Sequence, residues 1–210
     1  MFVIVVMIMR HRTHSLLRVA VFRIILRLES QKKRDMRKTV ARIAEGIDRM
    51  NAAIGRVAAW CCLYVVLAEF AVVVMRYALG IGSIRVQESV LYAHAALFML
   101  AAAWTLGADG HVRVDIFYAK AKPRTRALVD LLGAIVFLAP FAAVVTMLSI
   151  PYVARSWTVL ERSREASGLP FVYLLKTLIP LFALLLGLQG VAQAIRAALV
   201  LSEPGGRQAR

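Results

Sequence analysis

Four apolar runs constrain the fold of this chain more than any other feature of its sequence. They cover approximately residues 57–79, 90–107, 127–150 and 172–195. At 1.5 Å per residue, a helix of about twenty residues covers roughly 30 Å, the thickness of the hydrocarbon core of a bilayer. Hydrophobic residues make up 60% of the chain, against about 45–50% in soluble domains. The sequence therefore predicts an all-α membrane protein with four transmembrane helices, and excludes a soluble enzyme or a disulfide scaffold.

The segment before the first apolar run is strongly basic. Residues 1–56 are predicted to be a cytoplasmic segment, residues 57–201 the four-helix membrane domain and residues 202–210 a cytoplasmic tail. The apolar stretch at residues 1–9 is too short to span a bilayer. Its basic residues follow the apolar run, whereas those of a secretory signal precede it. Residues 16–28, interrupted by arginines, are typical at most of a basic interfacial helix. The sequence leaves open whether translation begins at Met1 or at Met36.

Lysine and arginine are distributed unequally between the two ends of the predicted helices. Cytoplasmic loops of membrane proteins carry the excess of these residues. Three segments carry most of these residues: the one before the first helix, the one between the second and third helices, and the one after the fourth. Together they have about three times as many basic residues as the other two loops. Both termini are therefore predicted to face the cytoplasm.

Small residues recur at four-residue spacing along two of the predicted helices. This spacing lets helices approach closely, which favours association inside lipid. It predicts helix-packing positions, either within a compact scaffold or against a larger partner. These positions are Ala103 and Gly107, Ala183 and Gly187, and Gly190 and Ala194.

Three ionisable residues, Glu69, Arg76 and Lys176, lie within the predicted helices or at their ends. A charge at the bilayer centre costs about 2.5–3.5 kcal/mol. Glu69, near the middle of the first helix, is interpreted either as a carboxylate in an ion path or as a neutral or hydrogen-bonded group. The second interpretation, a neutral side chain or one hydrogen-bonded to Gln189 or Gln193, is favoured because no other acidic residues accompany Glu69. Arg76 and Lys176 are expected to reach outward to the membrane boundary.

No motif of an enzyme or a metal site is present. Cys61 and Cys62 are adjacent and have no further cysteine partners, whereas redox pairs are spaced and structural zinc needs four ligands. His94 is the only histidine in a predicted helix and cannot supply the usual pair of haem ligands. We therefore expect no enzymatic activity and no cofactor. The net charge of +15 is expected to serve topology and contact with membrane lipids, and not nucleic acid.

Four short segments resemble a known transporter family. They are RYALG at residues 76–80, VQES at 86–89, GHVRVD at 110–115 and SREASGLP at 163–170. Their order and spacing are similar to those of small permease (DctQ-like) subunits of tripartite ATP-independent periplasmic (TRAP) transporters. Val86 and Ser89 stand where this family often has a tryptophan and a second acid.

The resemblance implies a non-catalytic subunit of the bacterial inner membrane. In such transporters a large permease (DctM-like) subunit moves the solute by an elevator-like motion driven by an ion gradient. A periplasmic solute-binding (DctP-like) protein delivers an organic acid. The small subunit braces the large one and helps to present a docking surface to the binding protein.

The resemblance also implies sites in the loops. The two outer loops, about residues 80–89 and 151–170, are expected to contact the binding protein through Arg85, Glu88, Arg162, Arg164 and Glu165. In the cytoplasmic loop the motif positions are Gly110, His111 and Asp115. Asp109, His111 and Asp115 are expected to cap or orient the end of the second helix.

Two other functions are compatible with four membrane helices. One is a haem-bearing anchor subunit of a respiratory complex, and the other is a self-sufficient small oligomeric transporter with Glu69 in the ion path. The sequence does not identify the transported solute, the coupling ion or the oligomeric state.

Overall fold

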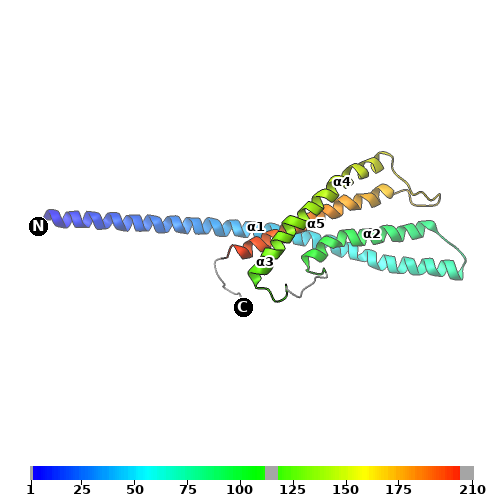
Figure 1. Cartoon of the computed structure of the whole chain (residues 1–210), viewed down its shortest axis with the longest axis horizontal. Coiled ribbons are helices and arrows are strands. Elements are labelled where there is room, and N and C mark those ends of the chain that lie inside the picture. The colour runs from blue at the N-terminus through cyan, green and yellow to red at the C-terminus, as the bar shows by residue number, and fades with distance from the viewer. Residues whose placement is uncertain (1, 112–117, 204–210) are drawn as a thin grey trace. The chain divides into compact units, whose positions relative to one another are not determined.

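The computed structural model describes the backbone of residues 2–111 and 118–203, together with their side chains except those of residues 2–22 and 24–26. Two compact units are present, residues 1–42 and residues 43–210. All regular structure in the described ranges is helical. The helices, drawn in Figure 1, are α1 (Phe2–Ala78), α2 (Ile84–Gly107), α3 (Pro123–Leu132), the π-helix η1 (Gly133–Leu138), α4 (Ala139–Thr158) and α5 (Val172–Leu201).

Within residues 2–111 and 118–203, four helical segments are long and apolar enough to cross a membrane. They lie within Arg27–Ala78, Ile84–Gly107, Pro123–Thr158 and Val172–Leu201. Each contains one of the apolar runs of the sequence. The prediction of an all-α protein with four helices of membrane-spanning length is therefore confirmed.

The helices extend beyond the apolar runs that predicted them. α2 begins at Ile84 instead of near residue 90, and α4 continues to Thr158, past Pro151. An apolar run marks the part of a helix that suits the hydrocarbon core, whereas backbone hydrogen bonding continues into the polar boundary. The two connections expected on the outer side are accordingly shorter than the sequence predicted, and cover residues 79–83 and 159–171.

Proline does not end the helices in which it lies. Pro180 is inside α5, and Pro140 is the second residue of α4, directly after η1. Because proline has no N–H, it cannot donate to the carbonyl four residues before it. The wider π-helical turn lies where that hydrogen-bond pattern has to change, so α3, η1 and α4 run on without a loop between them.

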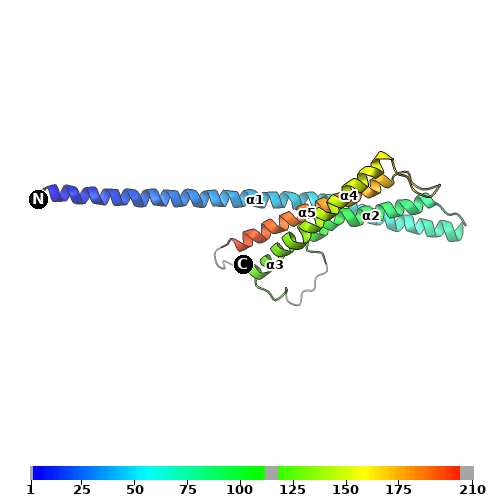
Figure 2. The same cartoon turned by 45° about the horizontal axis from the view of Figure 1, so that its top comes forward.

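The interior of the unit formed by residues 43–210 is made mainly of small side chains. Ala103 and Ala183 are 1% and 0% exposed, whereas Phe137 and Met147 are 75% and 72% exposed. α5 packs against both α2 and α4, and it lies beside α4 in Figures 1 and 2. Small residues inside and large apolar residues outside are the arrangement that a lipid environment favours.

Candidate functional site

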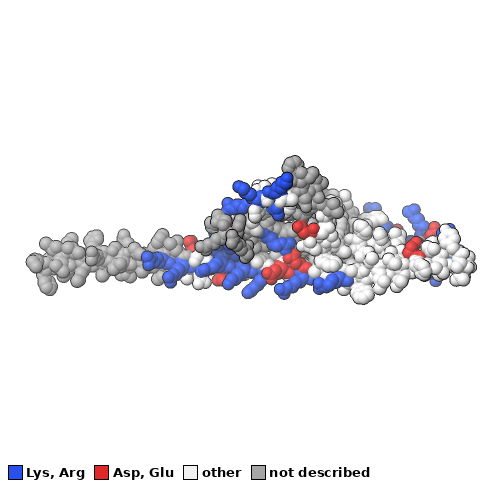
Figure 3. Space-filling view, turned by 90° about the horizontal axis from the view of Figure 1, so that it is seen from below, with Lys and Arg blue, Asp and Glu red and all other residues white. Residues whose placement is uncertain are grey.

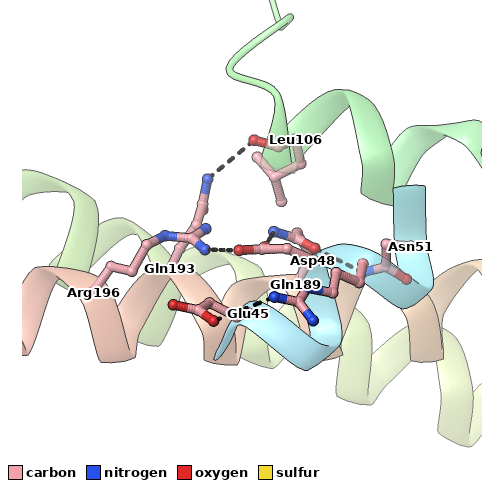
Figure 4. A network of polar contacts seen from close by, with 8 residues as sticks. Glu45, Asp48, Asn51, Leu106, Gln189, Gln193 and Arg196 are labelled. Atoms are coloured by element: carbon pink, nitrogen blue, oxygen red, sulfur yellow. Dashed lines mark hydrogen bonds and ion pairs between the residues drawn. The ribbon is translucent and has the colours of Figure 1, made fainter. Parts of the chain in front are cut away.

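A connected group of polar side chains in this unit centres on Gln189 of α5, whose side chain is 0% exposed. Its Nε2 donates to Oδ1 of Asp48, and its Oε1 accepts a hydrogen bond from Nδ2 of Asn51, both at 2.7 Å. Asp48 and Asn51 are three residues apart on α1 and therefore share a face of the helix. Figure 4 shows the amide of Gln189 between these two side chains. Both ends of the buried amide are thus hydrogen-bonded, as burial requires.

Two further side chains of α5 extend this group. Arg196 forms an ion pair with Oδ2 of Asp48. Nε2 of Gln193 donates to the carbonyl oxygen of Leu106, at the end of α2, at 3.2 Å. The group therefore joins α1, α2 and α5 (Figure 4). We call Asp48, Asn51, Gln189, Gln193 and Arg196 the Gln189 cluster.

Two glycines allow the helices around the Gln189 cluster to approach closely. A Cβ atom added at Gly107 of α2 would lie 2.7 Å from Nε2 of Gln189. A Cβ atom added at Gly55 of α1 would lie 2.6 Å from Cε3 of Trp104. Real Cβ contacts are not this short, so both positions require glycine at the present helix separation.

The small residues of α5 predicted to pack against helices contact this chain itself. A Cβ atom at Gly190 would lie 2.6 Å from Cδ2 of Leu138, and one at Gly187 would lie 3.3 Å from Cβ of Ala142. Ala183 is fully buried, whereas Ala194 is partly exposed. Of the two arrangements considered, the structure thus places Gly187 and Gly190 within the chain's own helix bundle.

The hydrogen bond expected between Glu69 and a glutamine of the fourth helix is not formed. Gln189 and Gln193 bond to other groups, and within the described part of the chain Glu69 makes no hydrogen bond or ion pair. Glu69 lies eighteen residues beyond Asn51 on α1, which is about 27 Å at 1.5 Å per residue. That hypothesis was therefore wrong. Glu69 and Arg76 are both exposed on α1.

The connection between α4 and α5, residues 159–171, is folded by hydrogen bonds of its own backbone. We call it the arginine loop because it carries Arg162 and Arg164. The amide of Ser163 donates to the carbonyl of Leu169 at 3.1 Å, and the amide of Gly168 donates to the carbonyl of Glu165 at 2.9 Å. These bonds limit the number of conformations that the loop can adopt.

Glu88, near the start of α2, binds the arginine loop. Its Oε1 accepts a hydrogen bond from Oγ of Ser163, and its Oε2 accepts one from the backbone amide of Leu169 at 2.5 Å. A Cβ atom at Gly168 would lie 2.7 Å from Oε1 of Glu88, so this position also requires glycine. The side chain of Glu88, which was expected to contact a binding protein, is thus engaged within the chain.

A cavity of about 550 Å³ opens beside the arginine loop. Arg85, Arg162 and Arg164 line it together with Glu165. These are the other four residues expected at a docking surface. Nε of Arg85 donates to the carbonyl of Ser167 at 3.2 Å, which links α2 to the loop. Guanidinium groups bind carboxylates with two parallel hydrogen bonds, so this lining is suited to acidic groups.

Lys176 of α5 reaches the start of the arginine loop. Its Nζ lies 2.5 Å from Oε2 of Glu161 and 4.1 Å from the ring centroid of Tyr152. The hydrogen bond from Lys176 lowers the pKa of Glu161 below its usual value. Nearby, Nε1 of Trp157 on α4 donates to Oγ1 of Thr177 on α5 at 2.9 Å. These contacts join the ends of α4 and α5 at the loop.

The segment after α2 was expected to cap that helix. Asp109 has φ 59°, and the amide of Gly110 donates to the carbonyl of Thr105 at 2.8 Å. A left-handed residue followed by this six-to-one hydrogen bond is a Schellman motif, which ends a helix. The backbone of Asp109 therefore terminates α2. His111 is exposed, and Asp115 lies outside the described residues.

Sequence reasoning did not find Asp48 and Asn51, because they precede the first apolar run and fall in the segment assigned to the cytoplasm. The available signal was their spacing. Asp48 and Asn51 are three residues apart and share one face of α1. Gln189, Gln193 and Arg196 are spaced by four and then three residues, so they share one face of α5.

No metal site is found in the part of the chain that the structure describes. No group of three His, Cys, Asp or Glu side chains there is placed to hold an ion. His94 is exposed on α2 and packs against Phe98, with 5.3 Å between the ring centroids.

Four helices of membrane-spanning length, with polar side chains that hold the helices to one another and to a loop, define a multi-pass membrane protein. Residues 65–199 match the family of tripartite ATP-independent periplasmic transporters, DctQ component. Because this match covers more than half of the chain, the chain belongs to this family and is a small component of a TRAP transporter. No curated protein and no solved structure matches the chain.

Proposed function

We propose that this chain is the inner-membrane subunit that braces the large permease (DctM-like) subunit of a TRAP secondary transporter. It also helps to dock the periplasmic solute-binding (DctP-like) protein during ion-gradient-driven uptake of an organic acid. Membership of the DctQ family supports the place in a tripartite transporter. The observation that carries the docking role is the arginine-lined cavity beside the arginine loop.

The arginine loop is suited to a short-lived encounter with a soluble partner. Its backbone hydrogen bonds and its attachment to Glu88 fix the loop before any partner arrives. Binding then requires little further ordering, which reduces its entropic cost. Three guanidinium groups around one cavity attract acidic patches and raise the rate of encounter more than the final affinity. Acidic side chains on the binding protein are therefore the expected counterpart.

The bracing role is supported by the outer surfaces of the helices. Trp60 of α1 and Phe137 of η1 are 72% and 75% exposed, so these apolar faces are available to lipid or to another membrane subunit. The Gln189 cluster meanwhile fixes α1, α2 and α5 relative to one another. A rigid group of helices with apolar outer faces is suited to support a moving neighbour.

The bracing role is tested by purification in mild detergent through a C-terminal tag. A multi-span permease subunit should co-purify with the chain. If the chain alone, reconstituted in vesicles, accumulates a solute, the bracing role is wrong and the chain is a transporter by itself.

The docking role is tested by charge reversal in the arginine loop. Arg162→Glu combined with Arg164→Glu should weaken binding of the solute-binding protein by about tenfold or more, since like charges across an interface cost several kcal/mol. The matched control is Lys120→Glu combined with Lys122→Glu, which reverses two exposed charges on the side expected to be cytoplasmic. The control should leave binding unchanged. Equal effects of the two double variants would contradict docking at the loop.

Both termini are proposed to face the cytoplasm, because lysine and arginine concentrate on that side. Reporter fusions at Gly82, at Pro123 and after Arg210 should read outside, inside and inside. Any other order refutes this orientation and with it the periplasmic position of the arginine loop.

A further inference from the structure

The part of the basic segment before residue 43 has no role in the function proposed above. The family match begins at residue 65, so this segment lies outside it. Residues 2–42 are helical throughout. Between Arg23 and Arg42 the helix carries eight Lys or Arg residues and only two acids, Glu29 and Asp35. Figure 3 shows basic side chains gathered along the described part of α1.

The basic residues of this segment are ordered on the helix surface. At about 100° per residue, four of them fall within an arc of about 60°. All four side chains are exposed. They are Arg23, Arg27, Arg34 and Lys38, and we call them the basic stripe.

The other side of the same helix carries apolar residues together with Lys32 and Glu29. By the same rotation, Leu28, Met36 and Val40 are centred about 180° from the basic stripe. Leu28 and Met36 are 63% and 60% exposed. A helix with its basic residues concentrated on one face and exposed apolar side chains opposite them has the pattern of a helix that contacts a membrane interface.

We propose that residues 23–42 bind the anionic phospholipids of the membrane that holds the four spans. The apolar face enters the boundary between headgroups and acyl chains. Lysine and arginine snorkel, burying their aliphatic stems while their charged ends reach lipid phosphates.

Two observations favour a lipid surface over a nucleic acid or an acidic protein. The first is the apolar face, since a phosphate backbone in water offers Leu28 and Met36 nothing to bury against. The second is covalent attachment. Residue 42 is within about fifteen residues of the first apolar run, so a bilayer surface is always present at high effective concentration.

The test uses the full chain reconstituted in lipid vesicles. In a Cys61→Ala and Cys62→Ala background, an environment-sensitive dye is attached to Met36→Cys on the apolar face, or to Ser30→Cys beside the basic stripe. The vesicles contain phosphatidylcholine alone, or phosphatidylcholine with about a third phosphatidylglycerol to supply the anionic charge. The dye at position 36 should shift to the blue and be quenched by lipid-borne quenchers only in the anionic vesicles. The dye at position 30 should report water in both.

Salt and charge removal then test the basic stripe. Raising the salt from about 0.1 M to about 1 M shortens the Debye length from about 10 Å to about 3 Å and should release the helix. At the salt concentration that releases half of the unmodified helix, Arg34→Gln combined with Lys38→Gln should lower the ratio of bound to released helix by about 25-fold, or fivefold per charge. The matched pair Lys32→Gln and Lys33→Gln removes the same charge outside the basic stripe and should lower it much less.

Three outcomes would overturn the proposal. They are identical emission of the position 36 dye in the two vesicle types, equal loss of binding in the two double variants, and release of the helix from anionic vesicles by dilute double-stranded DNA. None of these measurements involves a permease subunit, so the result is independent of the proposed transporter role.

Discussion

Gln189 of α5 packs directly on Gly107 of α2, where a Cβ atom would lie only 2.7 Å from the amide nitrogen Nε2. The same nitrogen donates to Asp48, and the oxygen of the same amide accepts from Asn51. A side chain at position 107 would therefore push the buried amide away from both partners. Close approach of the helices and pairing of their polar groups depend on each other at this point.

Gly107→Ala should destabilise the helix bundle. Overpacking of this kind costs about 1–3 kcal/mol, and displacing Gln189 adds the cost of unpaired buried groups. The measurement is the unfolding free energy in detergent. Gly133→Ala in η1 is the control, because no atom lies within 4 Å of its added Cβ, and it should be neutral or slightly stabilising. Equal stability of the two variants would show that α2 can move away from α5 without loss of stability.

The ion pair of Asp48 and Arg196 should contribute measurably to stability. Their side chains are 36% and 41% exposed. Solvent screening therefore keeps the contribution of this ion pair to stability well below that of a buried pair. A double-mutant cycle with Asp48→Asn and Arg196→Gln should give a coupling of about 1 kcal/mol. The pair of Glu45 and Arg49 is the control, because at 3.7 Å with side chains 62% and 84% exposed it should couple by less than about 0.5 kcal/mol. Equal couplings would mean that Arg196 adds nothing beyond a surface contact.

The existence of the four helices could be predicted from the sequence because each needs only a local apolar run. Their polar contacts could not. Gln189 has apolar neighbours in sequence, and its partners Asp48 and Asn51 are about 140 residues away. A hydrogen bond between distant segments depends on which helices are adjacent, and hydropathy carries no information on that.

The same difference between local patterns and contacts with distant segments applies to the small residues and to the arginine loop. The spacing of Gly187 and Gly190 predicted close packing, but it did not say whether the neighbour belonged to this chain or to another. Similarly, Glu88 was grouped with the arginines as a surface charge. Its engagement with Ser163 and Leu169 depends on the fold of the arginine loop, which sequence spacing does not specify.

Acid should weaken the contact between the arginine loop and α5. The hydrogen bond from Lys176 lowers the pKa of Glu161 in the folded chain, whereas in the unfolded chain the pKa is about 4.3. Because the folded pKa is the lower one, the stabilisation is fully present above pH about 4.3 and is lost as the pH falls through the folded value. Glu161→Gln should remove this part of the acid dependence. Its thermal unfolding should be compared with that of Glu69→Gln, which alters a carboxylate with no bond in the described part of the chain.

Loss of the carboxylate of Glu88 should loosen the arginine loop. In Glu88→Ala the hydroxyl of Ser163 and the amide of Leu169 lose their acceptor, and hydrogen bonds to a charged group are stronger than those between neutral groups. Local opening should therefore increase by about tenfold or more, and trypsin should cleave after Arg162 and Arg164 faster by a similar factor. Glu69→Ala removes an exposed carboxylate from α1 without touching the loop, so its cleavage rate should match that of the unmodified chain. If Glu88→Ala is cleaved no faster than this control, the loop is held by its backbone hydrogen bonds alone and Glu88 is free for another role.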